Sequence, residues 1–170
     1  MYRGDMELFS YDVPVEAEAS ARRSFESIGV GMRFEAPAPV TLSEAQITAF
    51  AEQFDPQPQH TDATANHPLF TPPIASGAHS FAICHRMAVD ACFEELGFIG
   101  GVGIDRLRWY TPLEAGMTIE TEVEVTDRRR STSREGRAYL SIEVNGRTQD
   151  RSPKTVISYT ATGILETDTA

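Results

Sequence analysis

Strict alternation of apolar and polar residues in the second half of the chain predicts β-strands. In Thr118–Val125, isoleucine, threonine and two valines fall on one side, and a threonine and three glutamates fall on the other. Ala138, Leu140, Ile142 and Val144 repeat this period of two. Such alternation is typical of an antiparallel sheet with one face on the core and one face in water. Two further strands are predicted at Gly103–Tyr110 and Thr155–Leu165.

A helical period replaces the alternation in the first half of the chain. Ser43-Glu44-Ala45-Gln46 fits a capping box, in which the serine hydroxyl and the glutamine amide satisfy backbone N–H groups at a helix start. Apolar residues then recur every three or four positions from Ile47 to Phe54 and form one stripe. We expect this helix to end at Asp55, because Pro56 disfavours helical backbone at the residue before it.

A second, longer helix is predicted at Ala78–Leu96. It follows Ser76-Gly77, and Gly97 is well placed to cap its C-terminus. Its apolar residues cover a broad face, so we expect the helix to be buried against a large partner. The antiparallel strands supply that partner, and the predicted fold is an α+β arrangement in which the sheet packs on the helix.

The remaining segments complete a single predicted domain over residues 29–167. Residues 1–28 form a polar N-terminal extension, with a short helix expected around Glu16–Ser24. Arg33–Thr41 is predicted to be a short extended segment. Asn145-Gly146 is a turn signal, although the polar residues 147–154 favour a longer connection between the last two strands.

Charge and hydropathy exclude several classes of function. The formal net charge is −10, and apart from Arg128-Arg129-Arg130 the chain has no basic cluster, so nucleic-acid binding is not expected. No segment approaches the roughly 20 apolar residues that span a bilayer. The N-terminus has early charges and no continuous apolar run, so it does not resemble a signal peptide, and we expect a cytoplasmic protein.

Asp55 and His60 are candidates for acid–base chemistry. They lie five residues apart in Asp-Pro-Gln-Pro-Gln-His, where two prolines predict a stiff, extended loop. A carboxylate and an imidazole that face one water molecule can take a proton from it and return one. The spacing alone is equally compatible with an aspartate that ends a helix and a histidine on the surface.

Ser76-Gly77 could bind the carbonyl oxygen of a substrate. The first N–H groups of a helix have no partner inside the helix, and the helix dipole places positive charge there. Glycine also lets a ligand approach the backbone closely. From the residues alone, an ordinary serine cap followed by a closely packed glycine explains the motif as well.

Both motifs together resemble the MaoC-like dehydratase family, which includes the (R)-specific enoyl-CoA hydratases. The residues that carry the resemblance are Phe50–Asp62, with Asp-Pro-Gln-Pro-Gln-His, and Pro73–Gly77. The family signature is Asp-x-Asn-Pro-x-His, followed by His-Gly or Ser-Gly at the start of the long helix. Leu107–Thr118 resembles a further strand and turn of the family. The resemblance covers about residues 30–166.

The resemblance implies a hot-dog fold, in which a curved antiparallel sheet wraps a long helix, and a hydratase or dehydratase acting on an enoyl or 3-hydroxyacyl thioester. It assigns the catalytic roles to Asp55 and His60, and the thioester oxygen to Gly77, beside Ser76. Coenzyme A would be part of the substrate, with acyl-carrier protein as the alternative carrier and no separate cofactor or metal. Gln57 stands where asparagine is usual, so its hydrogen bonds must be aimed differently; with Ser76 and Gly77 it is expected to be a substrate-binding residue.

Other readings remain open at this stage. A thioesterase on the same fold and a non-catalytic subunit that binds acyl thioesters are the two alternative functions. A metal site built from His60, Asp62 and His67 matches no known ligand spacing. Arg106, Arg108 and Arg128–Arg130 could contact the phosphates of coenzyme A, or they could be solvated surface charges. His79 could line the site, and His85 is expected in the core or at a subunit contact.

The sheet edge predicts self-association. An exposed edge strand offers unpaired backbone groups, which pairing with a second copy satisfies. The family pairs its domains into dimers. We therefore expect at least a homodimer, with the thioester tunnel at the contact between the subunits.

Overall fold

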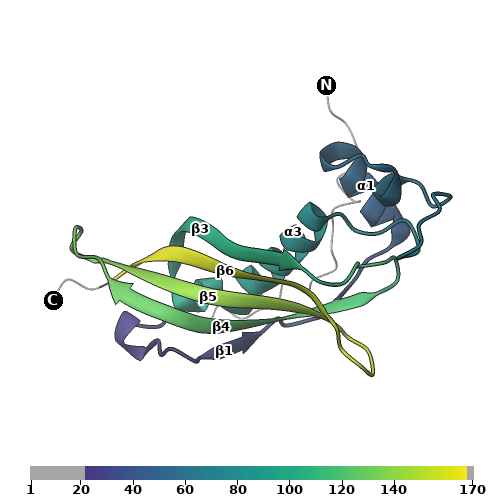
Figure 1. The fold of residues 1–170 in the computed structure, drawn as a ribbon. Helices are drawn as coiled ribbons and strands as arrows, with labels where there is room; N and C mark the ends of the chain where they lie inside the picture. Colours follow the sequence, from purple (N-terminus) through teal and green to yellow (C-terminus); the bar gives the residue numbers. More distant parts are fainter. Residues whose placement is uncertain (1–21, 168–170) are drawn as a thin grey trace.

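Four long antiparallel strands and one long helix make up most of the computed structural model, which describes residues 22–167 (Figure 1). The strands are β3 (Phe98–Trp109), β4 (Thr118–Arg130), β5 (Arg137–Thr148) and β6 (Thr155–Glu166). Two short strands, β1 (Arg33–Glu35) and β2 (Val40–Thr41), both pair with β4. The sheet order is β1-β4-β5-β6-β3, so β3 lies at one edge. This arrangement confirms the predicted α+β class.

The alternating residues face the core as their period predicts. Ile119, Val123 and Val125 of β4 are buried together with Thr121. The same holds for the four alternating residues of β5, and Val123 lies opposite Val144 in the register of the two strands. Burying every second side chain of both strands on one side gives the sheet an apolar face, against which the helix packs.

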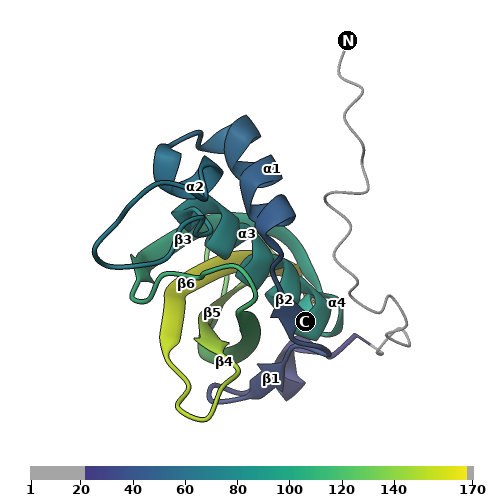
Figure 2. The same ribbon diagram turned by 90° about the vertical axis from the view of Figure 1, so that its right-hand side faces the viewer.

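The long helix starts and ends where the sequence predicts, but it is not uniform. It consists of α3 (Gly77–Ala88), a π-helical segment η3 (Val89–Phe93) and α4 (Glu94–Leu96). Gly97 follows in the left-handed conformation, with φ of 72°, and caps the helix as expected. A π segment holds one extra residue in its turn and shifts the side chains that follow. In the end-on view the strands curve around α3, and α1 and α2 lie together near its start (Figure 2).

Helix α1 (Glu44–Phe54) carries both halves of the predicted capping box. Ser43 Oγ accepts a hydrogen bond from the backbone N–H of Gln46 at 3.2 Å, and Gln46 Oε1 accepts from the N–H of Ser43 at 2.9 Å. The helix ends at Asp55, as Pro56 predicts. The loop that follows is not fully extended, which corrects the prediction: Pro58 begins a short helix, α2 (Pro58–Thr61). Proline suits the first position of a helix because its missing N–H would have no helical partner there.

Two other expectations about the strands are wrong. Asn145-Gly146 is not a turn but lies inside β5, and the connection to β6 comes later, at residues 149–154. Strand β3 begins at Phe98 rather than at Gly103. The short helix expected around Glu16–Ser24 lies mostly outside the described residues. Within residues 22–167, no helix is long and apolar enough to cross a membrane.

Candidate active site

The end of α1 places the carboxylate of Asp55. The backbone N–H of Asp55 still bonds to the carbonyl of Ala51 at 2.8 Å, but its φ and ψ of −159° and 68° turn the chain out of the helix. The N–H of Gln57 then donates to the carbonyl of Asp55 at 2.8 Å. The aspartate is therefore held from both sides in a tight turn, and its side chain is only 27% exposed.

His60 is buried and has a defined orientation. Its Nδ1 lies 2.8 Å from the carbonyl oxygen of Ile74, and the N–H of Ile74 donates to the carbonyl of Gln59 at 3.0 Å. A carbonyl can only accept, so Nδ1 carries the proton of the neutral ring. The other nitrogen, Nε2, then has a free lone pair. The short helix α2 therefore presents a base whose tautomer is set by the backbone.

Asp55 and His60 face each other across a gap. Oδ2 of Asp55 lies 3.7 Å from Nε2 of His60. This separation is too long for a direct hydrogen bond between the two groups. It suits a water molecule that bonds to both, since polar groups more than about 3.5 Å apart are commonly bridged in this way. The structure thus brings together the two residues that the sequence singles out.

Gln57 supports the carboxylate despite its longer side chain. Its Nε2 donates to Oδ1 of Asp55 at 2.6 Å, and its Oε1 accepts from Nε2 of Gln59 at 3.0 Å. The bond from Gln59 determines which end of the Gln57 amide faces Asp55. One oxygen of the carboxylate is thereby occupied, and the other is left for the gap beside His60. Gln57 is therefore positioned to orient Asp55 rather than to contact a substrate.

The start of α3 forms the opposite side of the site. Ser76 is buried, and its Oγ accepts from the N–H of His79 at 3.2 Å, as expected of an N-cap. Gly77 follows as the first residue of α3. Trp109 covers Gly77: the indole Nε1 donates to the Gly77 carbonyl at 3.0 Å, and a Cβ on Gly77 would lie 2.9 Å from Trp109 Cε2. A larger residue at this position would have to displace the indole.

His60 and Gly77 line one pocket of about 280 Å³. Its wall is otherwise formed by the segments before α3 and after β3. The lining residues are His60, Ile74, Ala75, Gly77, Ser80, Trp109, Tyr110, Thr111, Pro112 and Leu113. Asp55 is not among them, but its Oδ2 lies 3.7 Å from Nε2 of His60, which lines the pocket. The pocket therefore holds a helix N-terminus and a basic nitrogen on walls that are largely apolar.

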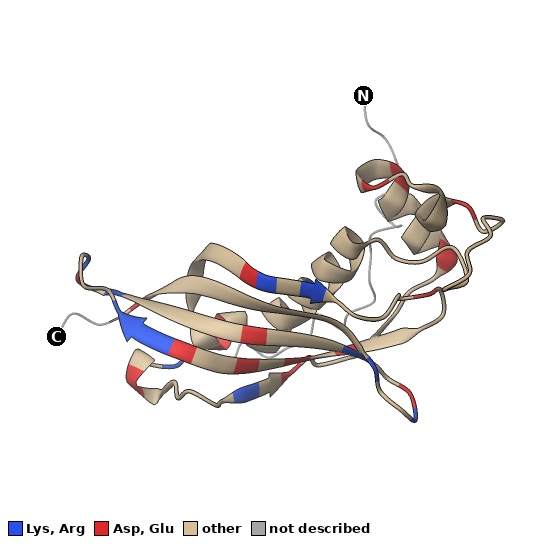
Figure 3. Cartoon of the chain, viewed as in Figure 1, with Lys and Arg blue, Asp and Glu red and all other residues tan. Residues whose placement is uncertain are grey.

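The arginines of Arg128–Arg130 do not belong to this site. They lie at the end of β4, far from α1. Figure 3 shows this end of the strand in blue, the colour of Lys and Arg. Arg128 stacks on Phe25 and donates to the carbonyl of Ile28, and Arg129 stacks on Tyr139. Arg106 and Arg108 lie on β3 and line a neighbouring pocket of about 340 Å³, which shares Tyr110 with the pocket of His60 and Gly77.

The residues considered for a metal site have other partners. The carboxylate of Asp62 accepts from both the N–H and the hydroxyl of Thr64. His67 stacks on Phe70, with ring centroids 3.7 Å apart. No group of three His, Cys, Asp or Glu side chains arranged for a metal ion occurs in the described part of the chain. The metal alternative therefore has no support in the geometry of these residues.

Sequence reasoning missed two features of the site. One is the hydrogen bond from the Gln59 amide to the Gln57 amide. The sequence held a signal for it, because both glutamines lie on the same short segment. The other is Trp109, which closes the site over Gly77 from a distant strand. The aromatic residue was visible in the sequence, but its partner depends on how β3 crosses α3 and no local pattern reveals that.

The chain is similar to known proteins in sequence and in fold. Residues 25–145 match the model of the MaoC-like domain family. The crystal structure of a MaoC-like dehydratase from Rhodospirillum rubrum is 33% identical, with 87% of this chain and 99% of that chain covered and a TM-score of 0.76. The unliganded R-hydratase PhaJ1 from Pseudomonas aeruginosa is 23% identical, with 85% and 86% covered and a TM-score of 0.61.

A third structure identifies the architecture. A protein from Mycobacterium tuberculosis described as having a double hot-dog fold is 15% identical, with 86% of this chain and 45% of that chain covered and a TM-score of 0.66. At that identity the likeness concerns the fold alone, and it confirms the hot-dog arrangement that the sequence predicts. No curated protein sequence matches the chain.

Proposed function

The chain belongs to the MaoC-like domain family, and from this premise we propose that it is a hydratase or dehydratase acting on an enoyl or 3-hydroxyacyl thioester, most simply that of coenzyme A. The observation that carries the proposal is the gap of 3.7 Å between Asp55 Oδ2 and His60 Nε2. A water molecule beside these two atoms would bond to a carboxylate oxygen of Asp55 and to Nε2 of His60.

The proposed reaction adds the elements of this water across the double bond. Its oxygen bonds to C3 of the enoyl thioester while one of its protons passes to the pair formed by Asp55 and His60. The pair returns a proton to C2, and the product is the 3-hydroxyacyl thioester. Dehydration is the reverse sequence, in which the proton leaves C2 and the hydroxyl leaves C3 as water. Neither residue is consumed in either direction.

The start of α3 supports the same reaction. During hydration, electron density moves from the double bond to the thioester oxygen. A donor at that oxygen stabilises the charge, and the N–H of Gly77 at the positive end of a helix supplies one. The cap at Ser76 occupies the N–H of His79, so the N–H of Gly77 is left directed out of the helix. His60 and Gly77 line the same pocket, which the reaction requires.

The edge strand supports the proposal of a homodimer. Within residues 22–167, strand β3 has a neighbour on one side only. Four of its apolar residues are between 40% and 56% exposed, namely Ile99, Val102, Ile104 and Trp109. Pairing with β3 of a second copy would give the unpaired backbone N–H and C=O groups of this edge hydrogen-bond partners. It would also cover these apolar side chains. We expect a mass of two chains or more in analytical ultracentrifugation, and a mass of one chain would contradict this part of the proposal.

Product analysis tests the function. The protein is mixed with crotonyl-CoA, and the products are separated and weighed by mass spectrometry. Hydration predicts a product heavier by one water with the thioester intact. Release of free coenzyme A, detected with a thiol reagent, would instead indicate a thioesterase. Binding without any product, over a series of enoyl chain lengths, would indicate a non-catalytic subunit.

A further inference from the structure

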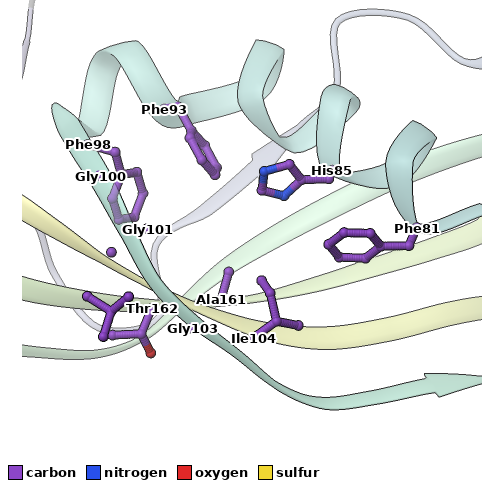
Figure 4. Close-up of a pocket in the computed structure, with 12 residues that line it drawn as sticks. Phe81, His85, Phe93, Phe98, Gly100, Gly101, Gly103, Ile104, Ala161 and Thr162 are labelled. Atoms are coloured by element: carbon purple, nitrogen blue, oxygen red, sulfur yellow. The ribbon is translucent and has the colours of Figure 1, made fainter. Parts of the chain in front are cut away.

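A second, larger cavity lies between the long helix and strands β3 and β6. Its volume is about 470 Å³, and Figure 4 shows the side chains that line it. Phe81 and Phe93 come from the helix, and Phe98 and Ile104 come from β3. The walls are therefore mostly aromatic and aliphatic. One polar ring, His85, lies among them between Phe81 and Phe93 (Figure 4).

The sequence of β3 leaves this space open. Gly100, Gly101 and Gly103 line the cavity, and a Cβ on any of them would meet no atom within 4 Å. The register between β3 and β6 also shifts at Phe98/Gly100 and at Gly101/Gly103, so the strand is irregular where it passes the helix. On the helix side, η3 carries Phe93 into the wall. The cavity is therefore open along this exposed stretch of β3, where the glycines contribute no side chains.

The cavity lies further along the same helix than the candidate active site. Gly77, Phe81 and His85 are four residues apart, which places them on one face of the helix. The rise of 1.5 Å per residue puts the backbone of His85 about 12 Å from that of Gly77 along the helix axis. Both pockets are bounded by this helix and by β3 or the segment after it. An acyl chain whose thioester lies at Gly77 would extend toward His85.

The hydrogen bonding of His85 defines what its ring can offer. Nδ1 of His85 lies 3.3 Å from the hydroxyl of Tyr159, the one hydrogen-bond partner of that hydroxyl within residues 22–167. Tyr159 is buried, and burial raises the pKa of its phenol, so the hydroxyl keeps a proton to donate. Partial burial also lowers the pKa of His85, so the ring is neutral near pH 7. If the phenol donates to Nδ1, the ring proton is on Nε2.

We propose that the Nε2–H of His85 donates a hydrogen bond to an oxygen atom in the distal part of the acyl group. This inference rests on the proposed function and adds a substrate class to it: acyl chains that carry a hydroxyl, keto or carboxyl oxygen beyond the reacting carbons. A polar N–H in an apolar cavity costs free energy when an alkyl chain displaces the water around it. An oxygen atom of the acyl group that accepts a hydrogen bond from this N–H offsets the cost. The site therefore binds such an acyl group more tightly than a plain alkyl chain.

Direct binding of thioesters that cannot react tests the inference. Hexanoyl-CoA, 6-hydroxyhexanoyl-CoA and adipyl-CoA have the same number of acyl carbons and no double bond. Titration calorimetry of the full chain should show that at least one oxygenated ligand binds about five- to tenfold more tightly than hexanoyl-CoA, which is the worth of one such hydrogen bond. The comparison of the hydroxyl and carboxyl ligands shows which oxygen the site prefers.

Two variants identify the donor. His85→Phe keeps an aromatic ring but removes Nε2–H, and we expect it to lose the preference and to bind hexanoyl-CoA at least as tightly as the wild type does. Tyr159→Phe removes the phenol that holds the tautomer, and we expect an intermediate preference. The inference is overturned if the wild type binds the three ligands equally, as it would if a second copy of the chain filled the cavity. A preference that persists in His85→Phe overturns it as well.

Hydration of crotonyl-CoA separates this inference from the proposed function. Crotonyl-CoA carries no oxygen beyond the reacting carbons, so its hydration by the wild type reports on the proposed function without the distal hydrogen bond. Hydration without any preference among the three six-carbon ligands overturns the inference alone. The protein could also hydrate no enoyl thioester and still show a ligand preference that depends on His85. That result would contradict the proposed function but support the proposed hydrogen bond from His85.

Discussion

The indole of Trp109 lies directly on Gly77, with its Nε1 donating to the Gly77 carbonyl at 3.0 Å. A Cβ at residue 77 would come within 2.9 Å of the ring, which is closer than such atoms approach in proteins. Strand β3 thus fixes the start of α3 at the point where the thioester oxygen is proposed to bind. The contact also explains why a glycine is needed there in addition to any role of its N–H.

Gly77→Ala is therefore expected to impair catalysis more than folding. The new methyl group must push Trp109 aside and shift the N–H that is proposed to polarise the thioester. Loss of one such donor commonly lowers kcat by about a hundred- to a thousandfold, and we expect a decrease of this order. Gly29→Ala is the matched control, because a Cβ there meets its nearest atom at 3.8 Å. Unchanged kinetics in Gly77→Ala would exclude this residue from the oxygen site.

Gln57→Leu tests the support of the carboxylate. The change removes the hydrogen bond of 2.6 Å to Asp55 Oδ1 and frees the carboxylate to rotate away from His60. Because Gln57 is proposed to orient Asp55 and not to bind the substrate, kcat should fall about tenfold while KM changes little. Steady-state kinetics with crotonyl-CoA measure both. Gln53→Leu, on the exposed side of α1, is the control. A rise in KM at constant kcat would instead place Gln57 in the binding site.

Buried His79 predicts that the protein loses stability in mild acid. Burial lowers the pKa of His79 to about 4, whereas the unfolded chain binds a proton on this residue near pH 6.5. Between these values the unfolded state holds more protons, so the free energy of unfolding falls as the pH decreases. Urea unfolding at pH 7.5 and at pH 5 measures how much the free energy of unfolding decreases between the two. This decrease should be about 2 kcal/mol larger in the wild type than in His79→Gln. An equal decrease in the two proteins would show that His79 does not cause the loss of stability in acid.

Gly146→Ala is expected to destabilise the fold. A Cβ at residue 146 would lie 2.6 Å from Sγ of Cys84 on α3 and 2.9 Å from Cγ2 of Ile157 on β6. Both neighbours are buried, so the extra methyl group overpacks the core and should cost about 1–3 kcal/mol of unfolding free energy. Thermal unfolding followed by circular dichroism measures this, with Gly29→Ala again as the control. A variant as stable as the wild type would show that the helix can move away from β5.

Gly146 also shows where a local pattern can mislead. Asn-Gly is a strong turn signal because both residues tolerate left-handed backbone. Here the glycine is retained for a different reason, the close approach of α3 to the sheet at Cys84. The start of β3 was missed for a related reason, since three glycines in Phe98–Gly103 weaken the strand signal. Gly146 makes room for a neighbour that is distant in the sequence, whereas Gly100, Gly101 and Gly103 of β3 border open space.

Structural features that depend on residues close together in the sequence were predicted correctly. The capping box at Ser43, the end of α1 at Asp55 and the alternation in β4 each follow from local hydrogen bonding or from the period of the element. The pairing of Asp55 with His60 could be predicted because one short segment carries both residues. The contacts of Trp109 with Gly77 and of His85 with Tyr159 depend on where β3 and β6 cross the helix, and sequence spacing does not determine that crossing.

The rates at which the wild type and Asp55→Asn hydrate crotonyl-CoA show whether the carboxylate of Asp55 transfers protons in the reaction. Asparagine keeps the shape of the side chain but cannot take up or return a proton, so hydration should fall by about a hundred- to ten-thousandfold. Glu52→Gln removes a carboxylate from the exposed side of the same helix and should leave the rate unchanged. A rate in Asp55→Asn equal to that of the wild type would contradict the account.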